Sequence, residues 1–249
     1  MHETGRERQL AALRERIGGL ERDAQARPVL PVGIPAIDRH LPGGGLRLGA
    51  LHEVVEAGPA AGHAALAALF VGGLLARLPG PILWCLAGRD LFAPGLAAVG
   101  LHPDRVLYAE TRRVTEVLPT MEEGLRHGSL AAVVGEVARV GLTASRRLQL
   151  AAERGGSLAL VIRRWREGAG AGAEPSAAAT RWCVAAAPSP ASSVPGLSRA
   201  CWSLALLRAR GAEPRTWLVE APDAQGRLRL PADLADRPPA AQERRAAAG

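Results

Sequence analysis

The residues best suited to chemistry lie within residues 54–65, where a glycine-containing turn separates an apolar run from an alanine-rich run. A loop that binds phosphate groups reads G-x-x-x-x-G-K-[ST], with the lysine on the β- and γ-phosphates and the hydroxyl on Mg²⁺. Here His63 stands in the lysine position and Ala64 in the hydroxyl position. We therefore predict a vestigial phosphate loop formed by Gly58, Pro59, Gly62 and His63.

A second group combines arginine with tryptophan on both sides of the low-complexity segment 167–179, which we expect to be a loop. Guanidinium groups bind phosphates and indole rings stack on bases, so the combination is typical of a nucleic-acid contact. The same composition also occurs at protein interfaces and in ordinary exposed loops, and these alternatives stay open. The candidates for a DNA or partner contact are Arg163, Arg164, Trp165, Arg166, Arg181 and Trp182.

Other patterns of catalytic or metal-binding residues are weak. The chain contains neither H-E-x-x-H nor G-x-S-x-G, and its three cysteines lie far apart without a C-x-x-C pair. We therefore expect no metal site and no catalytic residues. An odd number of dispersed cysteines also disfavours a disulfide framework and is typical of a reducing compartment.

The overall charge allows two interpretations. All 31 basic residues are arginine, and against 24 acidic residues they give a formal net charge of +7. This excess favours an acidic partner such as nucleic acid, but a GC-rich genome would also produce the arginine bias. The polar start and the shortness of the longest apolar stretch, residues 64–76, lead us to expect a cytoplasmic protein without a membrane segment.

Strands and helices must alternate to position these groups. We expect strands at residues 51–56, 81–86, 106–109, 131–137 and 158–162, and helices at 62–78, 93–99, 115–127 and 142–154. This alternation predicts an α/β fold in which helices cover both faces of a mostly parallel sheet.

The flanking segments differ in character. Closely spaced strands at 180–187, 201–210 and 216–220, with a final hairpin or strand that includes 227–230, predict a C-terminal antiparallel extension of the sheet. We divide the chain into an N-terminal helix (1–28), one α/β domain (29–230) and a flexible tail (231–249), which is rich in proline, alanine and charge.

The lead-in to the loop resembles the entry into the RecA-type ATPase core. It consists of Gly33, then Ile37-Asp38, the turn Gly43-Gly44-Gly45-Leu46, and Gly49. The element order is similar over residues 29–220. More narrowly, the chain resembles the ImuA family in its length, its arginine-rich start, its decayed loop, and the segments 198–202 and 216–220. The related SulA family is shorter and lacks so long a C-terminal part.

Compared with RecA-type enzymes, the catalytic positions depart from the pattern in two further places. The second strand is followed by Arg89 and Asp90 rather than a glutamate, and we expect Asp90 to begin or cap the next helix. The fourth strand carries Gly135 where an aspartate would hold Mg²⁺, and we expect Glu136 to face the other side of the sheet. We therefore predict no ATPase activity and no cofactor.

The resemblance implies an accessory role in the error-prone translesion synthesis of the SOS response. The implied partners are an ImuB-type, Y-family-like hub protein, with RecA as a further candidate and an error-prone replicative-type polymerase bound indirectly. Segment 167–179 falls where RecA-type proteins carry DNA-contacting loops, so direct DNA contact stays open. The alternatives are a SulA-like inhibitor of cell division and a nucleotide-binding RecA-type ATPase.

Overall fold

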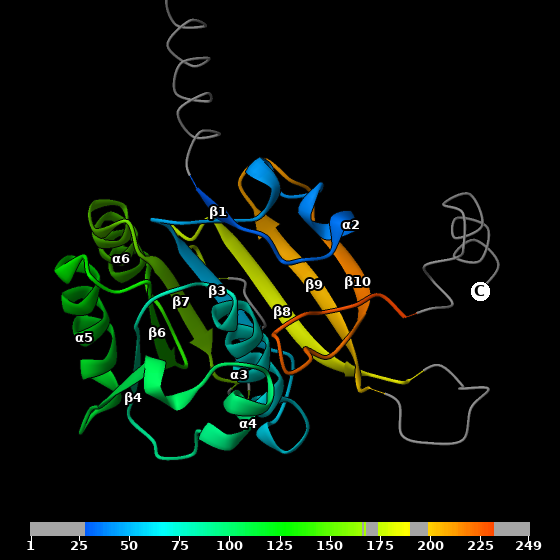
Figure 1. The fold of residues 1–249 in the computed structure, drawn as a ribbon. Coiled ribbons are helices and arrows are strands. Elements are labelled where there is room, and N and C mark those ends of the chain that lie inside the picture. The colour runs from blue at the N-terminus through cyan, green and yellow to red at the C-terminus, as the bar shows by residue number, and fades with distance from the viewer. Residues whose placement is uncertain (1–27, 166, 168–173, 190–198, 232–249) are drawn as a thin grey trace, which may run out of the picture.

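One eight-stranded sheet organises the residues that the structure, a computed structural model, describes: 28–165, 167, 174–189 and 199–231 (Figure 1). The predicted N-terminal helix and nearly all of the predicted tail lie outside these ranges. The strands of the sheet are β3 (Leu51–Glu56), β4 (Ile82–Leu86), β5 (Val106–Glu110), β6 (Ala132–Val137), β7 (Leu158–Arg163), β8 (Thr180–Ala187), β9 (Cys201–Ala209) and β10 (Arg215–Glu220). The main helices are α3 (Ala60–Ala76), α4 (Ala93–Ala98), α5 (Val114–His127) and α6 (Leu142–Gly155).

The strand order is β10-β9-β8-β3-β7-β6-β4-β5. Strands β3 to β8 pair in parallel, whereas β9 and β10 are antiparallel. Parallel neighbours need crossover connections, and the helices supply them between β3 and β7. The predicted fold, a mostly parallel sheet with a C-terminal antiparallel extension, is therefore confirmed.

Helices cover both faces of the sheet, and adjacent residues of one strand serve opposite faces. Val134 packs in the apolar cluster that contains Phe70 of α3, while Val133 packs in the cluster that contains Met121 of α5. Figure 1 shows α3 and α4 on one side of the sheet and α5 and α6 on the other. Strands β3, β6 and β7 are buried on both faces, and the sequences of β6 and β7 are mostly apolar as a result, whereas β3 also buries His52, Glu53 and Glu56.

Several boundaries differ from the expected ones for local reasons. Helix α3 begins at Ala60, two residues before the expected start, because alanine is the strongest helix former. Helices α5 and α6 end at His127 and Gly155, and the glycines that follow them, Gly128 and Gly156, have φ angles of 72° and 71° that suit glycine. The final hairpin or strand expected to include 227–230 forms no continuous strand, but an antiparallel bridge joins Arg229 to Glu220 and a turn closes at Asp223 and Arg227. Among the described helices, none is long and apolar enough to cross a membrane.

The glycine-rich lead-in forms a small lobe from β1 (Val29–Leu30), α2 (Pro35–Asp38) and β2 (Leu46–Arg47). The carboxylate of Asp38 accepts hydrogen bonds from the backbone N–H of Val32 (2.6 Å) and Gly33 (3.0 Å). Arg77, which follows α3, donates to the carbonyl oxygens of Pro31 (2.8 Å) and Val32 (3.0 Å). These hydrogen bonds fix the lead-in to the C-terminal end of α3.

Candidate functional site

The segment predicted to be a vestigial phosphate loop is a three-residue turn. Strand β3 ends at Glu56 and α3 begins at Ala60, and within the first turn the N–H of Gly62 already donates to the carbonyl oxygen of Pro59 at 3.1 Å. A phosphate cradle needs several successive N–H groups that point into one concavity before the helix begins. Early helix formation removes those residues from the loop, so the turn is too short to surround a phosphate chain.

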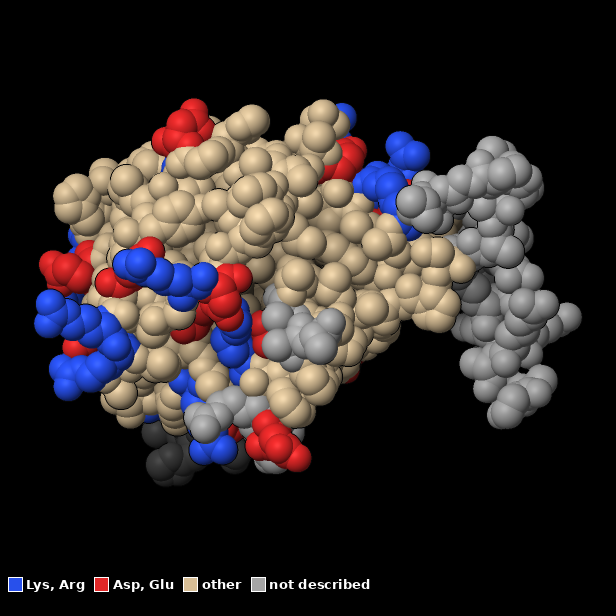
Figure 2. Space-filling view, turned by 90° about the horizontal axis from the view of Figure 1, so that it is seen from below, with Lys and Arg blue, Asp and Glu red and all other residues tan. Residues whose placement is uncertain are grey.

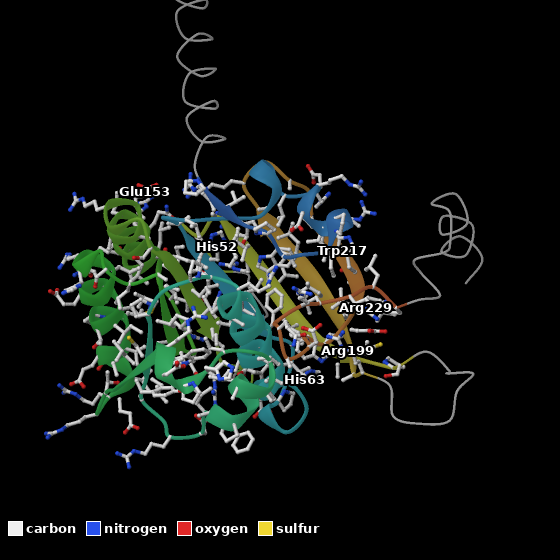
Figure 3. The ribbon with its side chains drawn as sticks, viewed as in Figure 1. His52, His63, Glu153, Arg199, Trp217 and Arg229 are labelled. Atoms are coloured by element: carbon white, nitrogen blue, oxygen red, sulfur yellow. The ribbon has the colours of Figure 1, made fainter. Side chains whose placement is uncertain are left out.

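His63 lies back against this turn, at the lower end of α3 in Figure 3. A Cβ atom placed on Gly58 would lie 2.9 Å from Cδ2 of the His63 ring. The ring therefore occupies the space directly over the loop glycine. Its Nδ1 atom is buried and has no hydrogen-bond partner among the described residues. In this position the side chain fills the loop and does not extend towards a ligand as the missing lysine would.

An arginine-centred cluster lies beside the turn at the carboxyl ends of four adjacent strands. Arg164, directly after β7, forms ion pairs with Glu136 of β6 (Nη1–Oε2, 2.6 Å) and Glu56 of β3 (Nε–Oε1, 3.4 Å). It also pairs with Asp90, which follows β4. In open α/β sheets ligands bind at this edge. Here one guanidinium group and three carboxylates occupy this edge of the sheet. We call these four residues the Arg164 cluster.

Backbone and side-chain donors complete the cluster. The indole N–H of Trp84 donates to Glu136 Oε1 at 2.7 Å, and the backbone N–H of Trp165 donates to Glu56 Oε2 at 2.7 Å. The side chains of Glu56 and Glu136 are only 2% and 5% exposed. Both carboxylates are thus held in place within the protein, where an uncompensated charge would be costly.

Burial dominates the electrostatics of the cluster. Burial raises the pKa of Glu56 and of Glu136, and Arg164 opposes both shifts. Burial also lowers the pKa of Arg164, but the three carboxylates outweigh it and the net pKa shift is upwards. With all four groups ionised, three negative charges face one positive charge. The residues present therefore do not fit a magnesium-bound nucleotide, because the turn is too short to surround the phosphates and the adjacent Arg164 is already paired with three carboxylates.

Two expectations about the catalytic positions have different outcomes. Glu136 faces the side of the sheet opposite to Gly135, as strand alternation predicted. A Cβ atom on Gly135 would lie 2.0 Å from Met121 Sδ on the α5 side. The expected capping role of Asp90 is wrong, because α4 begins at Ala93 without a side-chain cap and Asp90 instead pairs with Arg164.

The arginine and tryptophan residues predicted to contact DNA or a partner are mostly internal. Buried Arg181 donates to Glu53 Oε2 at 2.6 Å, and buried Arg163 lies 3.7 Å from the same oxygen. Arg163 also pairs with Glu174 (2.5 Å), which lies within segment 167–179. Trp182 is 0% exposed and packs 6.2 Å from both Phe70 and Trp217 between ring centroids. The prediction is therefore corrected for Arg163, Arg181 and Trp182, which present no surface.

The remaining candidates separate into three cases. Arg164 belongs to the cluster above, and Arg166 lies outside the described residues. Trp165 is 37% exposed and is available at the surface. The acidic partners Glu53 and Glu56 were not predicted, although two glutamates within a buried strand indicate that buried cations must pair with them.

Comparisons with known proteins identify the class of this fold. No protein-family model matches the chain. The crystal structure of the RadB recombinase is similar in fold, with a TM-score of 0.56 and 16% sequence identity over 81% of this chain and 99% of that one. The fold is thus that of a RecA-like α/β protein.

The sequence relatives are more specific. Protein ImuA of Caulobacter vibrioides, from strain NA1000 / CB15N and from strain ATCC 19089 / CIP 103742 / CB 15, is 39% identical over 229 residues, which cover 87% of this chain and 94% of the relative. The chain belongs to the ImuA family, and the resemblance found in the sequence is confirmed.

Proposed function

We propose that this protein is a non-catalytic, RecA-like accessory factor of SOS-induced, error-prone translesion DNA synthesis. It acts by binding other proteins. Its first partner is an ImuB-type hub protein, RecA is a second partner, and an error-prone replicative-type polymerase joins through the hub. Membership of the ImuA family and the RecA-like fold support this role.

The Arg164 cluster is the observation that carries the proposal. A RecA-type ATPase keeps the carboxyl edge of its sheet free for phosphates and Mg²⁺ and supplies cationic groups there. In this chain Arg164 lies at that edge, and three carboxylates engage it. A fold that keeps its architecture and fills its ligand site with internal ion pairs offers surfaces rather than chemistry.

The surface of the described residues also favours protein binding. Large apolar side chains are exposed at several separate places, among them Phe92 (72%), Leu107 (57%) and Leu150 (52%). Leu107 lies on β5, an edge strand of the sheet, where unpaired backbone groups are available to a partner. Single exposed apolar side chains are normal on a protein surface, so the edge strand is the feature that favours binding here.

Co-purification tests this proposal. The full chain, tagged and purified, is mixed in separate experiments with the hub protein from the same mutagenesis cassette, with RecA, and with the septal tubulin-like division protein. We expect retention of the hub protein, retention of RecA at lower yield, and no retention of the division protein. Retention of the division protein without the hub would instead indicate a SulA-like inhibitor and contradict the proposal.

A further inference from the structure

A groove between α3 and α4 adjoins the Arg164 cluster at the carboxyl edge of the sheet. It has a volume of about 300 Å³. Its apolar lining includes Ala65, Ala68, Leu69, Leu91, Phe92 and Leu96, and Asp90 and Arg164 close one end. Figure 2 shows this edge of the molecule, where charged side chains gather mainly on one side of a broad uncharged area.

Small residues keep the groove open. Ala65 and Ala68 lie about one turn apart on α3 and leave space that larger side chains would fill. Gly95 in α4 acts in the same way, since an added Cβ would lie 3.2 Å from Phe92 Cδ1 and 3.7 Å from Leu69 Cδ2. The Phe92 ring stands at the rim with 72% of its surface exposed. Covering an aromatic ring that is exposed beside an apolar groove removes apolar surface from water, and this burial makes the binding of a partner more favourable.

The charged residues of the groove determine which charge on a partner it favours. The side chain of Asp90 is 58% exposed, and it shares Arg164 with two buried carboxylates. The neighbouring Arg89 is itself paired with Glu110 at 2.7 Å. The Arg164 cluster therefore has more carboxylates than cations, and the exposed carboxylate lies at the groove. A positive group of a partner fits there, whereas a phosphate or carboxylate would be repelled.

We propose that this groove is the docking site of a protein segment that carries one bulky apolar side chain with a lysine or arginine beside it. The apolar side chain enters between α3 and α4 against Phe92, and the basic group pairs with Asp90. A buried apolar anchor with a charged neighbour at the rim is the usual arrangement at the centre of a protein interface. This inference rests on the proposed protein-binding function.

The test uses fluorescein-labelled 15-residue peptides that overlap along the hub protein, with binding to the full chain measured by fluorescence anisotropy. We expect that the bound peptides contain the apolar and basic pair. Ala65→Trp fills the groove from an exposed position and should weaken binding at least about tenfold, as loss of an interface anchor does. Phe92→Ala and Asp90→Asn should each weaken it about three- to tenfold. Leu150→Ala, which truncates another exposed apolar residue on α6, should leave it unchanged.

The outcomes separate the groove from the wider proposal. Thermal unfolding midpoints within a few degrees of wild type establish that the variants are folded. If the intact hub binds and the three groove variants bind peptides and hub as the wild type does, the groove is refuted while the proposed function stands. If the wild-type chain does not bind the hub at all, the proposed function fails and this inference fails with it. If Ala65→Trp instead dissociates a dimer in sedimentation velocity, a second copy occupies the groove and the inference is overturned.

Discussion

Arg164 and Asp90 lie 74 positions apart in the chain, yet their side chains form an ion pair at the carboxyl edge of the sheet. The pair connects the segment after β7 with the segment after β4, and the same guanidinium group reaches β3 and β6 through Glu56 and Glu136. One side chain thus joins the ends of four adjacent strands. In a nucleotide-dependent relative of this fold, a bound ligand would make such connections at this edge.

Removal of Arg164 should destabilise the fold. Arg164→Ala leaves Glu56 and Glu136 buried without their cation, and breaking a buried pair in this way costs about 3–5 kcal/mol. Because the Arg164 side chain is 29% exposed, solvent reduces the loss, and we expect roughly 2 kcal/mol at pH 7. Urea unfolding measures the change. Arg89→Ala, which removes an exposed arginine paired with Glu110, serves as control and should change the unfolding free energy by less than about 0.5 kcal/mol.

The effect of Arg164→Ala should depend on pH. Burial already raises the pKa of Glu56 and Glu136 above the ordinary value of 4.5, and loss of the cation raises both further. A carboxyl group with a raised folded-state pKa holds its proton in the folded protein, so the unfolding free energy decreases as the pH rises through that range. The difference between variant and wild type should therefore be larger at pH 8 than at pH 5. An equal difference at both pH values would show that these carboxyl groups do not cause it.

Glu53 should contribute more to the free energy of unfolding than Glu174, the more exposed glutamate that also pairs with Arg163. Glu53 is 0% exposed and pairs with Arg181 at 2.6 Å and with Arg163 at 3.7 Å, so Glu53→Gln removes a buried negative charge from beside two buried guanidinium groups. We expect a loss of about 3 kcal/mol in unfolding free energy. Glu174→Gln alters a 40% exposed side chain that pairs with the same Arg163 and should cost less than about 1 kcal/mol. Comparable losses for the two variants would contradict this ranking.

His52 should make the protein sensitive to mild acid. Its Nε2 donates to the carbonyl oxygen of Arg47 at 3.0 Å and its Nδ1 accepts from the Thr180 hydroxyl at 2.8 Å, an arrangement that requires a neutral ring. Burial lowers the pKa of His52 from 6.5 to about 4. The unfolded chain therefore binds the proton first as the pH falls. Stability is complete above pH 6.5 and is lost towards pH 4, by about 3 kcal/mol in total.

The variant His52→Gln isolates this contribution. Urea unfolding between pH 4 and 7.5 should show that the wild type loses stability relative to His52→Gln as the pH falls. Parallel curves for the wild type and His52→Gln would exclude His52 as the acid-sensitive group.

The fold could be predicted from the sequence largely because the central strands are buried on both faces. Continuous apolar runs such as β7 read as strands, and the helix between two of them follows from its spacing. The Arg164 cluster could not be predicted in this way. Arg164 lies 28 positions from Glu136 and 74 positions from Asp90 in the sequence. Such pairs follow from the order of the strands in the sheet rather than from local periodicity.

The start of α3 shows a local limit of the same kind. The glycine spacing indicated a long loop before residue 62, but Ala60 and Ala61 extend the helix towards β3. The prediction that the arginine and tryptophan residues around segment 167–179 lie at the surface was also wrong for Trp182 and Arg181. Composition identifies residue types that contact DNA and cannot tell whether a carboxylate such as Glu53 has already paired with them inside the protein.

Restoring the consensus side chains should not restore nucleotide binding. The double variant His63→Lys and Ala64→Ser supplies the lysine and the hydroxyl of a phosphate loop. The turn before α3 remains three residues long, and the Arg164 cluster keeps its excess of carboxylates. Isothermal titration of the double variant with ATP and Mg²⁺ should therefore show no binding. Binding that appears on this replacement alone would mean that the side chains, and not the shortened turn, abolish the site.

Equilibrium binding of labelled ATP with Mg²⁺ to the wild-type full chain tests the central claim most directly. A RecA-type ATPase of known activity, measured in parallel, shows that the assay detects saturable binding. We predict no saturable binding to this chain up to about 1 mM ATP, where a dissociation constant would correspond to only about −4 kcal/mol, and no release of phosphate. Micromolar affinity accompanied by turnover would contradict the account of a RecA-like fold that works without a nucleotide.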